Sequence, residues 1–270
     1  YNIPLWLINL WISEFGRDKT EDLCAWFNEQ PKLTARINTI LIDIPQCLTM
    51  LNEQGWAVTQ DSNYEDIIYI NSHRGSLEKS EAFIKGYITF MDKASMLVAR
   101  LVNPQPGERI LDCCAAPGGK SMYMATLMNN VGSLMSCDIH EHKIELMNSN
   151  ADRLGASIVH TKVQDATKLP DSWNSYFDRV LVDAPCSGLG ILQKKLDMRW
   201  RKQESILSEL PPLQLAILER AAMTVKEKGY LIYSTCTLNY KENEEVVESF
   251  LQKHKEFSII PVADDFPLKS

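Results

Sequence analysis

The segment that decides the fold class is Arg109-Ile-Leu-Asp-Cys-Cys-Ala-Ala-Pro-Gly-Gly-Lys-Ser121, which joins an apolar strand to a helix through a glycine turn. Small residues in such a turn let the backbone approach a ligand, and the start of the helix offers free amide groups. A glycine pair alone is a weak indication, because many tight strand–helix turns need one. The segment has neither the GxGxxG motif of dinucleotide sites nor the upstream glycine of a phosphate-binding loop. The turn therefore predicts a ligand site whose chemistry must come from the rest of the chain.

A regular alternation of predicted strands and helices begins at about residue 108 and continues after this turn. Amphipathic helix patterns cover Ile144–Leu154, Ile217–Val225 and Val246–Leu251. The predicted strands are Arg109–Cys114, Ser133–Ile139, Ser157–Val163, Phe177–Asp183, Tyr230–Thr235 and Phe257–Val262. Nearly continuous apolar strands that alternate with helices indicate an α/β fold with a mostly parallel sheet covered on both faces. Ligands of such sheets bind at the carboxyl ends of the strands.

The region before residue 75 has a different pattern and predicts a small N-terminal α/β subdomain. Its expected helices are Leu5–Phe15, Asp22–Asn28 and Pro45–Gln54, and its expected strands are Leu33–Asn38, Trp56–Val58 and Ile67–Ile70. The polar stretch Asn71–Ser80 is typical of a linker. We therefore predict one domain over residues 1–75 and a second over residues 76–270.

The ends of the chain indicate a piece of a longer protein. The chain begins at Tyr1 rather than Met and stops soon after the sixth predicted strand. We expect it to be truncated at both ends and to lack the last strand of its larger sheet. That sheet would then have an exposed edge.

Composition excludes several classes of protein. Hydrophobic residues make up 45% and charged residues 23% of the chain, with no apolar run near the roughly 20 residues of a membrane helix and no secretory signal. The seven cysteines are scattered, which favours a reducing cytoplasm over a disulfide framework. There is no paired CxxC set and there are only five histidines, so we expect no metal site. A net charge of −7 argues against a protein that coats nucleic acid nonspecifically, but it leaves room for a local basic groove.

Acidic residues lie at or just after three consecutive predicted strands, at Asp138, Asp165 and Asp183. One such residue is ordinarily explained as a helix cap. Three beside a glycine turn indicate a pocket for a nucleoside joined to an amino acid, which fits S-adenosylmethionine better than a dinucleotide. We expect Asp138 to accept both ribose hydroxyls and Asp165 to accept the adenine amine. The predicted backbone contacts to this cofactor come from Cys114, Ala115, Ala116, Pro117, Gly118, Gly119 and Lys120.

Two cysteines stand apart from the other five. Cys186 lies in Asp-Ala-Pro-Cys-Ser-Gly-Leu-Gly (183–190) and Cys236 lies in Tyr-Ser-Thr-Cys-Thr (233–237), each in a turn flanked by small polar residues at the end of a predicted strand. For Cys114 a place in the backbone of the cofactor turn is favoured over chemistry. The remaining cysteines are predicted to be buried as small hydrophobic side chains: Cys24, Cys47, Cys113 and Cys137.

These segments resemble the motifs of a known family. DCCAAPGGKS (112–121), DAPCSGLG (183–190) and YSTCTLNYKENEEVV (233–247) are similar to the NOL/NOP/Sun family of RNA cytosine-5 methyltransferases, and most of all to its bacterial Sun/Fmu-type 16S ribosomal RNA branch. Pro31–Asn38 resembles the amino-terminal signature of that family, so the resemblance covers nearly the whole chain. It implies a class I, Rossmann-like S-adenosylmethionine methyltransferase fold and an RNA substrate.

Two positions depart from the family pattern. Met91 stands where the family usually has glutamine, and Leu196 stands before Asp197 where the family usually has proline. Both positions concern the RNA side or packing rather than the cofactor. They weaken the substrate assignment more than the reaction type.

The chemistry of cytosine explains a need for two cysteines. Carbon 5 is too poor a nucleophile to take a methyl group until a thiolate adds at carbon 6, and a base must then remove the proton from carbon 5. The resemblance assigns the attack to Cys236 and the release to Cys186. The residues alone do not rank them, since DNA cytosine methyltransferases attack with the cysteine of the Pro-Cys motif. Asp183 could contact the base or the methionine amine, and Lys120 could either lower a thiol pKa or form a salt bridge.

A basic cluster follows the Pro-Cys motif and predicts contacts with RNA phosphates, with an ordinary solvated loop as the alternative. Its members are Lys194, Lys195, Arg199, Trp200, Arg201 and Lys202, and Arg36 and Arg74 could extend it. The target base must be unstacked to reach a thiol, so a loop or distorted helix is the expected substrate.

Other functions compete with RNA cytosine methylation. The chain could methylate another RNA such as tRNA, or it could methylate an amine or small molecule while Cys186 and Cys236 merely pack. It could also be a ribosome-assembly or RNA-binding factor without catalysis. The intact pair of cysteine motifs disfavours the last two, and we expect a monomer.

Overall fold

The computed structural model describes residues 2–262 and 266. The chain forms two compact units. The first unit combines Tyr1–Pro31, Ala184–Glu219 and Tyr233–Ile259, and the second combines Lys32–Asp183, Arg220–Ile232 and Ile260–Ser270. These units do not follow the domain boundary predicted near residue 75, because segments distant in sequence pack together in each of them.

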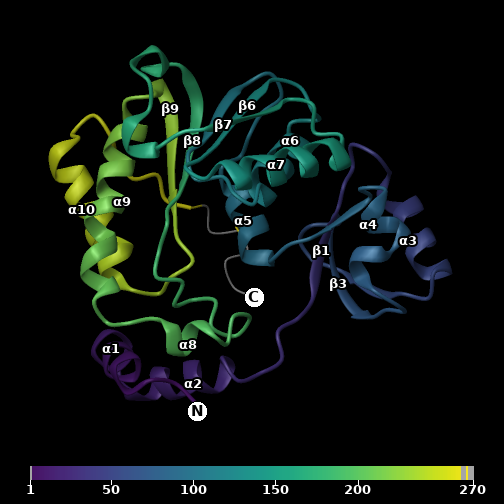
Figure 1. The fold of residues 1–270 in the computed structure, drawn as a ribbon, viewed down its shortest axis with the longest axis horizontal. Coiled ribbons are helices and arrows are strands. Elements are labelled where there is room, and N and C mark those ends of the chain that lie inside the picture. Colours follow the sequence, from purple (N-terminus) through teal and green to yellow (C-terminus); the bar gives the residue numbers. More distant parts are fainter. Residues whose placement is uncertain (1, 263–265, 267–270) are drawn as a thin grey trace. The chain divides into compact units, whose positions relative to one another are not determined.

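A small antiparallel sheet opens the second unit, with strand order β2-β3-β1-β4 (Figure 1). Its strands are β1 (Thr34–Ile37), β2 (Ala57–Gln60), β3 (Ile67–Ser72) and β4 (Ile88–Phe90), and its helices are α3 (Ile44–Glu53) and α4 (Glu81–Ile84). The Asp43 carboxylate accepts a hydrogen bond from the Gln46 amide, which caps α3. Ile37, Cys47, Leu51 and Ile68 form part of its buried core. The fourth strand comes from beyond residue 75, so the small sheet is completed by the predicted second domain.

The larger sheet of the second unit has the order β7-β6-β5-β8-β9. It is built from β5 (Arg109–Asp112), β6 (Ser133–Asp138), β7 (Val159–Val163), β8 (Phe177–Asp183) and β9 (Val225–Ser234). Strand β5 pairs in parallel with β6 and β8, and β6 pairs in parallel with β7. Helices α6 (Gly119–Leu127) and α7 (Glu141–Leu154) pack beside β6 and β7, and α5 (Lys93–Leu101) packs on α6 (Figure 1). The predicted parallel α/β sheet is confirmed.

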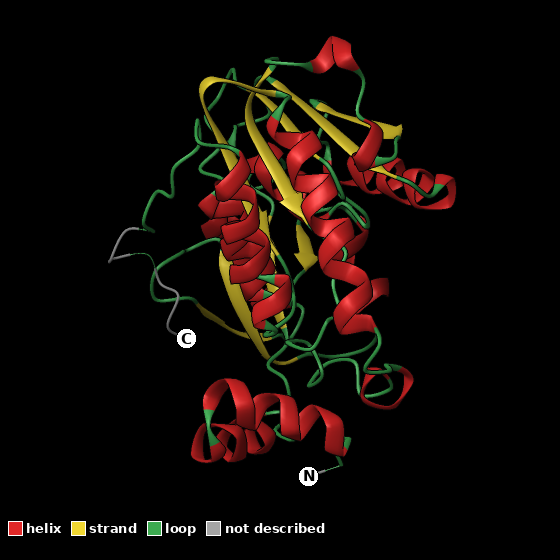
Figure 2. Cartoon of the chain, turned by 90° about the vertical axis from the view of Figure 1, so that its left-hand side faces the viewer, coloured by secondary structure: helices red, strands yellow, loops and turns green. Residues whose placement is uncertain are grey.

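The first unit is mainly helical. It contains α1 (Leu5–Phe15), α2 (Arg17–Trp26), α8 (Met198–Arg201), most of α9 (Ile206–Ala222) and α10 (Glu244–Lys253). Gly16 has a positive φ of 82° and allows the chain to turn between the first two helices, which lie side by side near the N-terminus in Figure 2. Their core contains Trp11 stacked on Phe27, with ring centroids 5.3 Å apart, together with Leu189 and Leu192. Short 3-10 helices complete the chain: η1 (Leu77–Lys79), η2 (Ala166–Lys168), η3 (Asp171–Trp173) and η4 (Tyr240–Glu242).

One predicted strand is wrong. Phe257–Val262 forms no strand, and Ile259 and Ile260 are 68% and 65% exposed. The ring of Phe257 packs on Phe250 of α10, and Pro261 has no amide hydrogen to donate to a neighbouring strand. The predicted linker Asn71–Ser80 is also partly structured, because β3 continues to Ser72 and η1 follows it.

The four cysteines predicted to be buried side chains, Cys24, Cys47, Cys113 and Cys137, are buried. Within residues 2–262 and at 266, no helix is long and apolar enough to cross a membrane. The same part of the chain contains no group of three or more histidine, cysteine, aspartate or glutamate side chains arranged to hold a metal ion.

Candidate active site

The glycine turn after β5 leads directly into α6. Gly118 has a φ of 95°, and a Cβ there would lie 3.1 Å from Cγ of Met147, so only glycine fits without displacement. Helix α6 begins at the next residue, Gly119, and its first amide groups have no partners within the helix. Glycine at 118 is thus explained by packing within the chain, and the contact of this turn with a cofactor stays a prediction.

Asp112 closes the strand just before this turn. Its side chain is buried and accepts a hydrogen bond of 2.7 Å from the Ser121 hydroxyl. Burial is the largest cause that raises the pKa of Asp112 and the negative charge of Asp183 adds to it, so that the pKa reaches about 7. An acidic group beside the turn is therefore only partly ionised near pH 7.

The carboxylates after the next two strands differ from each other. Asp138 is buried at the end of β6, where it accepts a 3.0 Å hydrogen bond from the His140 amide and lies 3.5 Å from the Lys143 ammonium. Asp165 caps η2 through hydrogen bonds from the Thr167 hydroxyl and amide, which lower its pKa. Capping is thus an actual role of Asp165, and its contact with adenine remains a prediction, as does the contact of Asp138 with ribose.

Lys120 and Asp183 form an ion pair. Nζ of Lys120, in the first turn of α6, lies 2.5 Å from Oδ2 of Asp183 at the end of β8, and both side chains are largely buried. Of the two roles that the sequence left open for Lys120, the salt bridge is the one observed. The pair fixes a cation and an anion together at the carboxyl end of β8.

The two predicted catalytic cysteines lie together in the first unit. Sγ of Cys186 is 3.0 Å from Sγ of Cys236 and 3.2 Å from the Cys236 amide nitrogen. Cys236 is exposed, whereas Cys186 is half-buried. The hydrogen bond to Cys236 and then burial raise the pKa of Cys186 above its usual range. The two thiols lie within hydrogen-bond distance of each other, and either sulfur can be the donor.

A buried polar network that the sequence analysis missed lies behind the two thiols. The Glu242 carboxylate is fully buried and accepts hydrogen bonds from the Ser187 amide and hydroxyl, at 2.8 and 2.5 Å. It also accepts from the side-chain amides of Gln214 and Asn239, at 2.9 and 3.1 Å. An acidic residue just before a helix ordinarily indicates an exposed side chain that interacts favourably with the helix dipole. For this reason the sequence alone does not reveal the buried role of Glu242. The detectable signal was Gln214, a polar residue on the buried side of α9.

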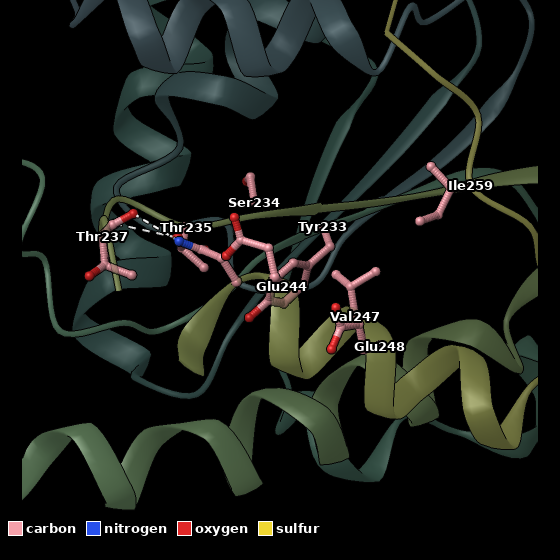
Figure 3. A pocket seen from close by; sticks show the side chains of 9 residues that line it. Tyr233, Ser234, Thr235, Thr237, Glu244, Val247, Glu248 and Ile259 are labelled. Carbon is pink, nitrogen blue, oxygen red and sulfur yellow. Dashed lines mark hydrogen bonds between the residues drawn. The ribbon is translucent and has the colours of Figure 1, made fainter. Parts of the chain in front are cut away.

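A pocket of about 500 Å³ opens beside the Thr-Cys turn (Figure 3). It is lined by Tyr233, Ser234, Thr235, Thr237, Asn243, Glu244, Val247, Glu248 and Ile259. Thr235 and Thr237 flank Cys236 in sequence, but Cys236 itself does not line the pocket. Asn243 holds the turn through hydrogen bonds with the Thr235 hydroxyl and the Thr237 carbonyl.

One member of the predicted basic cluster is buried, and the others are at least partly exposed. Arg199 is buried and donates to the carbonyls of Phe27 and Leu192 and to the Asn28 side chain, so its assignment to RNA is wrong. Trp200 is 65% exposed. Lys194, Lys195 and Arg201 are also exposed, and Lys202 is partly exposed.

Arg36 is likewise not an RNA contact. It is fully buried in the second unit, with its guanidinium 5.1 Å from the Tyr123 ring centroid and 3.1 Å from the Thr126 hydroxyl. Arg74 is exposed, as an RNA-binding residue requires. Both misassigned arginines bind partners far away in sequence, which a local basic pattern does not reveal.

Comparison with known proteins agrees with this geometry. Residues 99–268 match the family described as 16S rRNA methyltransferase RsmB/F, and residues 3–75 match the ferredoxin-like domain described as RsmF/B-like. The chain is 40% identical over 255 residues to the probable ribosomal RNA small subunit methyltransferase B of Bacillus subtilis, covering 94% of this chain and 57% of that protein. A relative of the same description from Synechocystis is 37% identical, with coverage of 97% and 59%.

A solved structure confirms the fold. The crystal structure of PH0851 superposes with a TM-score of 0.92 at 33% identity, covering 97% of this chain and 59% of that one. The chain thus spans less than two thirds of the length of these relatives. The resemblance drawn from the glycine turn and the two cysteine motifs is confirmed: the chain belongs to the RsmB/F family of 16S rRNA methyltransferases.

Proposed function

We propose that this chain transfers a methyl group from S-adenosylmethionine to carbon 5 of a cytosine in RNA, through a covalent bond between Cys236 and the base. The observation that carries the proposal is the thiol pair: two cysteines whose sulfur atoms lie 3.0 Å apart, of which one is exposed and the other half-buried. Family membership and the names of the relatives favour 16S ribosomal RNA as the substrate. The RNA substrate of the whole protein is likewise a proposal.

The residues of the second unit fit S-adenosylmethionine. The cradle at Gly118 and the free amides of α6 suit its amino-acid portion, and the buried carboxylate of Asp138 suits ribose hydroxyls. Asp165 is the proposed partner of the adenine. When bound, the cofactor supplies an electrophilic methyl group.

The chain's own groups perform the remaining steps. The Cys236 thiolate adds to carbon 6 of cytosine, which turns carbon 5 into an enamine carbon that takes the methyl group. Asp183, which pairs with Lys120 and precedes the Pro-Cys motif in sequence, is the proposed partner of the cytosine amino group or ring nitrogen 3. A base then removes the proton from carbon 5, and the carbon 6–sulfur bond breaks with return of its electron pair to Cys236.

Cys186 is the proposed base for that last step. The bond to Cys236 is the largest cause of its raised pKa. Once Cys236 is bonded to carbon, it can no longer hold Cys186 in this way, and the largest cause of the raised pKa of Cys186 is removed. Cys186 then loses its proton more readily, and its thiolate can accept the proton from carbon 5.

RNA contacts outside the thiols are proposed for the exposed members of the basic cluster, Lys194, Lys195, Trp200, Arg201 and Lys202, and for Arg74. Residues 1–75 are proposed as the RNA-side domain and residues 76–270 as the methyltransferase domain.

Nucleoside analysis tests the proposal. Purified chain is incubated with labelled S-adenosylmethionine and small-subunit ribosomal RNA or tRNA, and the RNA is digested and analysed by mass spectrometry. We expect label in 5-methylcytidine and from ribosomal RNA in preference to tRNA. Label in another nucleoside, or none with an RNA that the chain binds, contradicts the proposed reaction.

A further inference from the structure

Glu242 has no role in the reaction above, yet it is a fully buried carboxylate whose four hydrogen-bond donors are all neutral. Burying a carboxylate away from a cation is costly unless hydrogen bonds replace its hydration. Folding stability alone gives little reason to keep such a group. What its partners have in common is their position next to the two catalytic turns.

The network holds the Pro-Cys turn from both sides of Cys186. The amide and hydroxyl of Ser187, the following residue, both donate to Glu242. The side-chain amide of Gln214 donates to Glu242 at 2.9 Å and to the carbonyl of Pro185, the preceding residue, at 3.0 Å. The backbone on each side of Cys186 is therefore attached to one carboxylate.

The same network reaches the Thr-Cys turn. The Ser187 hydroxyl lies 2.8 Å from the hydroxyl of Thr237, the residue after Cys236. Because the carboxylate can only accept, Ser187 uses its single hydrogen on Glu242, and Thr237 must donate to Ser187. Asn239 adds a second link, since its amide nitrogen donates to the Thr237 hydroxyl and its side chain donates to Glu242. A directed chain of hydrogen bonds thus joins the residue after one cysteine to the residue after the other.

We propose that Glu242 is a positioning residue that holds the Pro-Cys and Thr-Cys turns in register, so that the thiols of Cys186 and Cys236 face each other. This inference rests on the proposed function for its catalytic consequence. The positioning itself does not depend on methyl transfer, because it concerns the geometry of two thiols in one unit.

Thiol–disulfide exchange measures this geometry without RNA or cofactor. Oxidised glutathione converts the two thiols into a disulfide and is reduced to two molecules of glutathione, and the equilibrium constant reports how well the thiols are juxtaposed. Peptide mapping restricts the measurement to the bond between Cys186 and Cys236. For Glu242→Ala we expect the constant to fall by about tenfold or more, since four donors lose their common acceptor.

Glu242→Gln is the conservative variant. Its amide oxygen can take the place of Oε2 and still accept from the Ser187 amide and from Gln214, while its new NH₂ group, in the place of Oε1, can donate to the Ser187 hydroxyl oxygen. We expect its exchange constant to stay within about threefold of wild type. Glu242→Asp shortens the side chain by one methylene group. Its exchange constant should lie between those of Glu242→Ala and Glu242→Gln. Leu7→Ala, a buried core change in the same unit, should lower the Tm but leave the constant unchanged.

Ser187→Ala keeps the claim testable if Glu242→Ala does not fold. It removes the hydroxyl link to Thr237 while the Ser187 amide bond stays, and we expect a drop of about threefold. In single-turnover methylation, Glu242 variants should lower the rate at saturating RNA and cofactor without raising KM. Folded Glu242→Ala and Ser187→Ala with wild-type exchange constants overturn the positioning role. If the wild-type protein forms no 5-methylcytidine, the proposed function is overturned. The exchange constants would still test the positioning role of Glu242, because they involve neither RNA nor cofactor.

Discussion

Two kinds of cysteine-bearing turn are compared in the described part of the molecule, and they differ in how water reaches their thiols. The turn after β5 carries the buried Cys113 and the partly buried Cys114, where burial raises the pKa of both thiols above its usual range. The turns after β8 and β9 carry Cys186 and Cys236, one thiol exposed and the two in contact. A thiol at a strand end becomes chemically useful only when water and a proton-sharing partner reach it. The predictions below test whether this difference separates structural from catalytic cysteines.

The largest effect should come from replacing the exposed thiol. Cys236→Ser should lower methylation of RNA by about 10⁴-fold or more, because a hydroxyl at this position is a far poorer nucleophile than a thiolate. The measurement is the initial rate of label transfer. Cys24→Ala, a buried cysteine of the same unit, is the matched control and should lower the Tm while keeping the rate. If Cys236→Ser keeps more than a tenth of wild-type activity, the exposed thiol is not the nucleophile, and the distinction between catalytic and structural cysteines is contradicted.

Much of this contrast is predictable from sequence. The helix at Leu5–Phe15, the glycine turn and the parallel order of strands follow from local periodicity and from small residues at strand ends. The separation of Cys186 and Cys236 from the four buried cysteines also follows, because small polar neighbours mark open turns.

The rest depends on contacts distant in sequence. Arg199 belongs to a basic run, but its acceptors include the Phe27 carbonyl, so no local pattern distinguishes it from an RNA contact. Phe257–Val262 alternates like a strand, but a strand needs a neighbour to pair with, and Phe257 packs on a helix instead. Glu242 has the sequence context of a helix-start acid and the environment of a core residue.

The burial of Asp112, beside the glycine turn after β5, predicts that the free energy of unfolding depends on pH. The pKa of Asp112 is raised from about 3.8 in the unfolded chain to about 7. Its contribution is fully present below pH 4 and is lost as pH rises through 7, because the folded chain then must bury a charge. The free energy of unfolding should therefore fall by up to roughly 4 kcal/mol over this range through Asp112 alone.

Asp112→Asn should flatten that part of the pH profile, measured by urea unfolding between pH 4 and pH 8. The slope is the readout, since the substitution can also shift the whole curve. Asp22→Asn, on the exposed surface of α2, is the control and should leave the slope as in wild type. Equal slopes in wild type and Asp112→Asn contradict the assigned environment of the turn.

A smaller effect is expected from the carboxylate that ends β6. Asp138→Asn should weaken binding of S-adenosylhomocysteine by about tenfold, because an amide loses one charge-assisted hydrogen bond to ribose. Isothermal titration calorimetry measures the Kd, and Asp152→Asn on the exposed side of α7 is the control. The thiol exchange constant should not change in either variant. An unchanged Kd in Asp138→Asn removes this residue from the cofactor site.

The most direct test of the central claim is to find which sulfur bonds to cytosine. Cys186→Ser is incubated with S-adenosylmethionine and RNA, denatured, digested with nuclease and protease, and analysed by mass spectrometry. If Cys186 serves release and Cys236 serves attack, the variant should accumulate a methylated cytosine on the peptide containing Cys236. The double variant with Cys236→Ser should form no adduct. Recovery of an adduct in that double variant, or full turnover by Cys186→Ser without any adduct, would contradict the account.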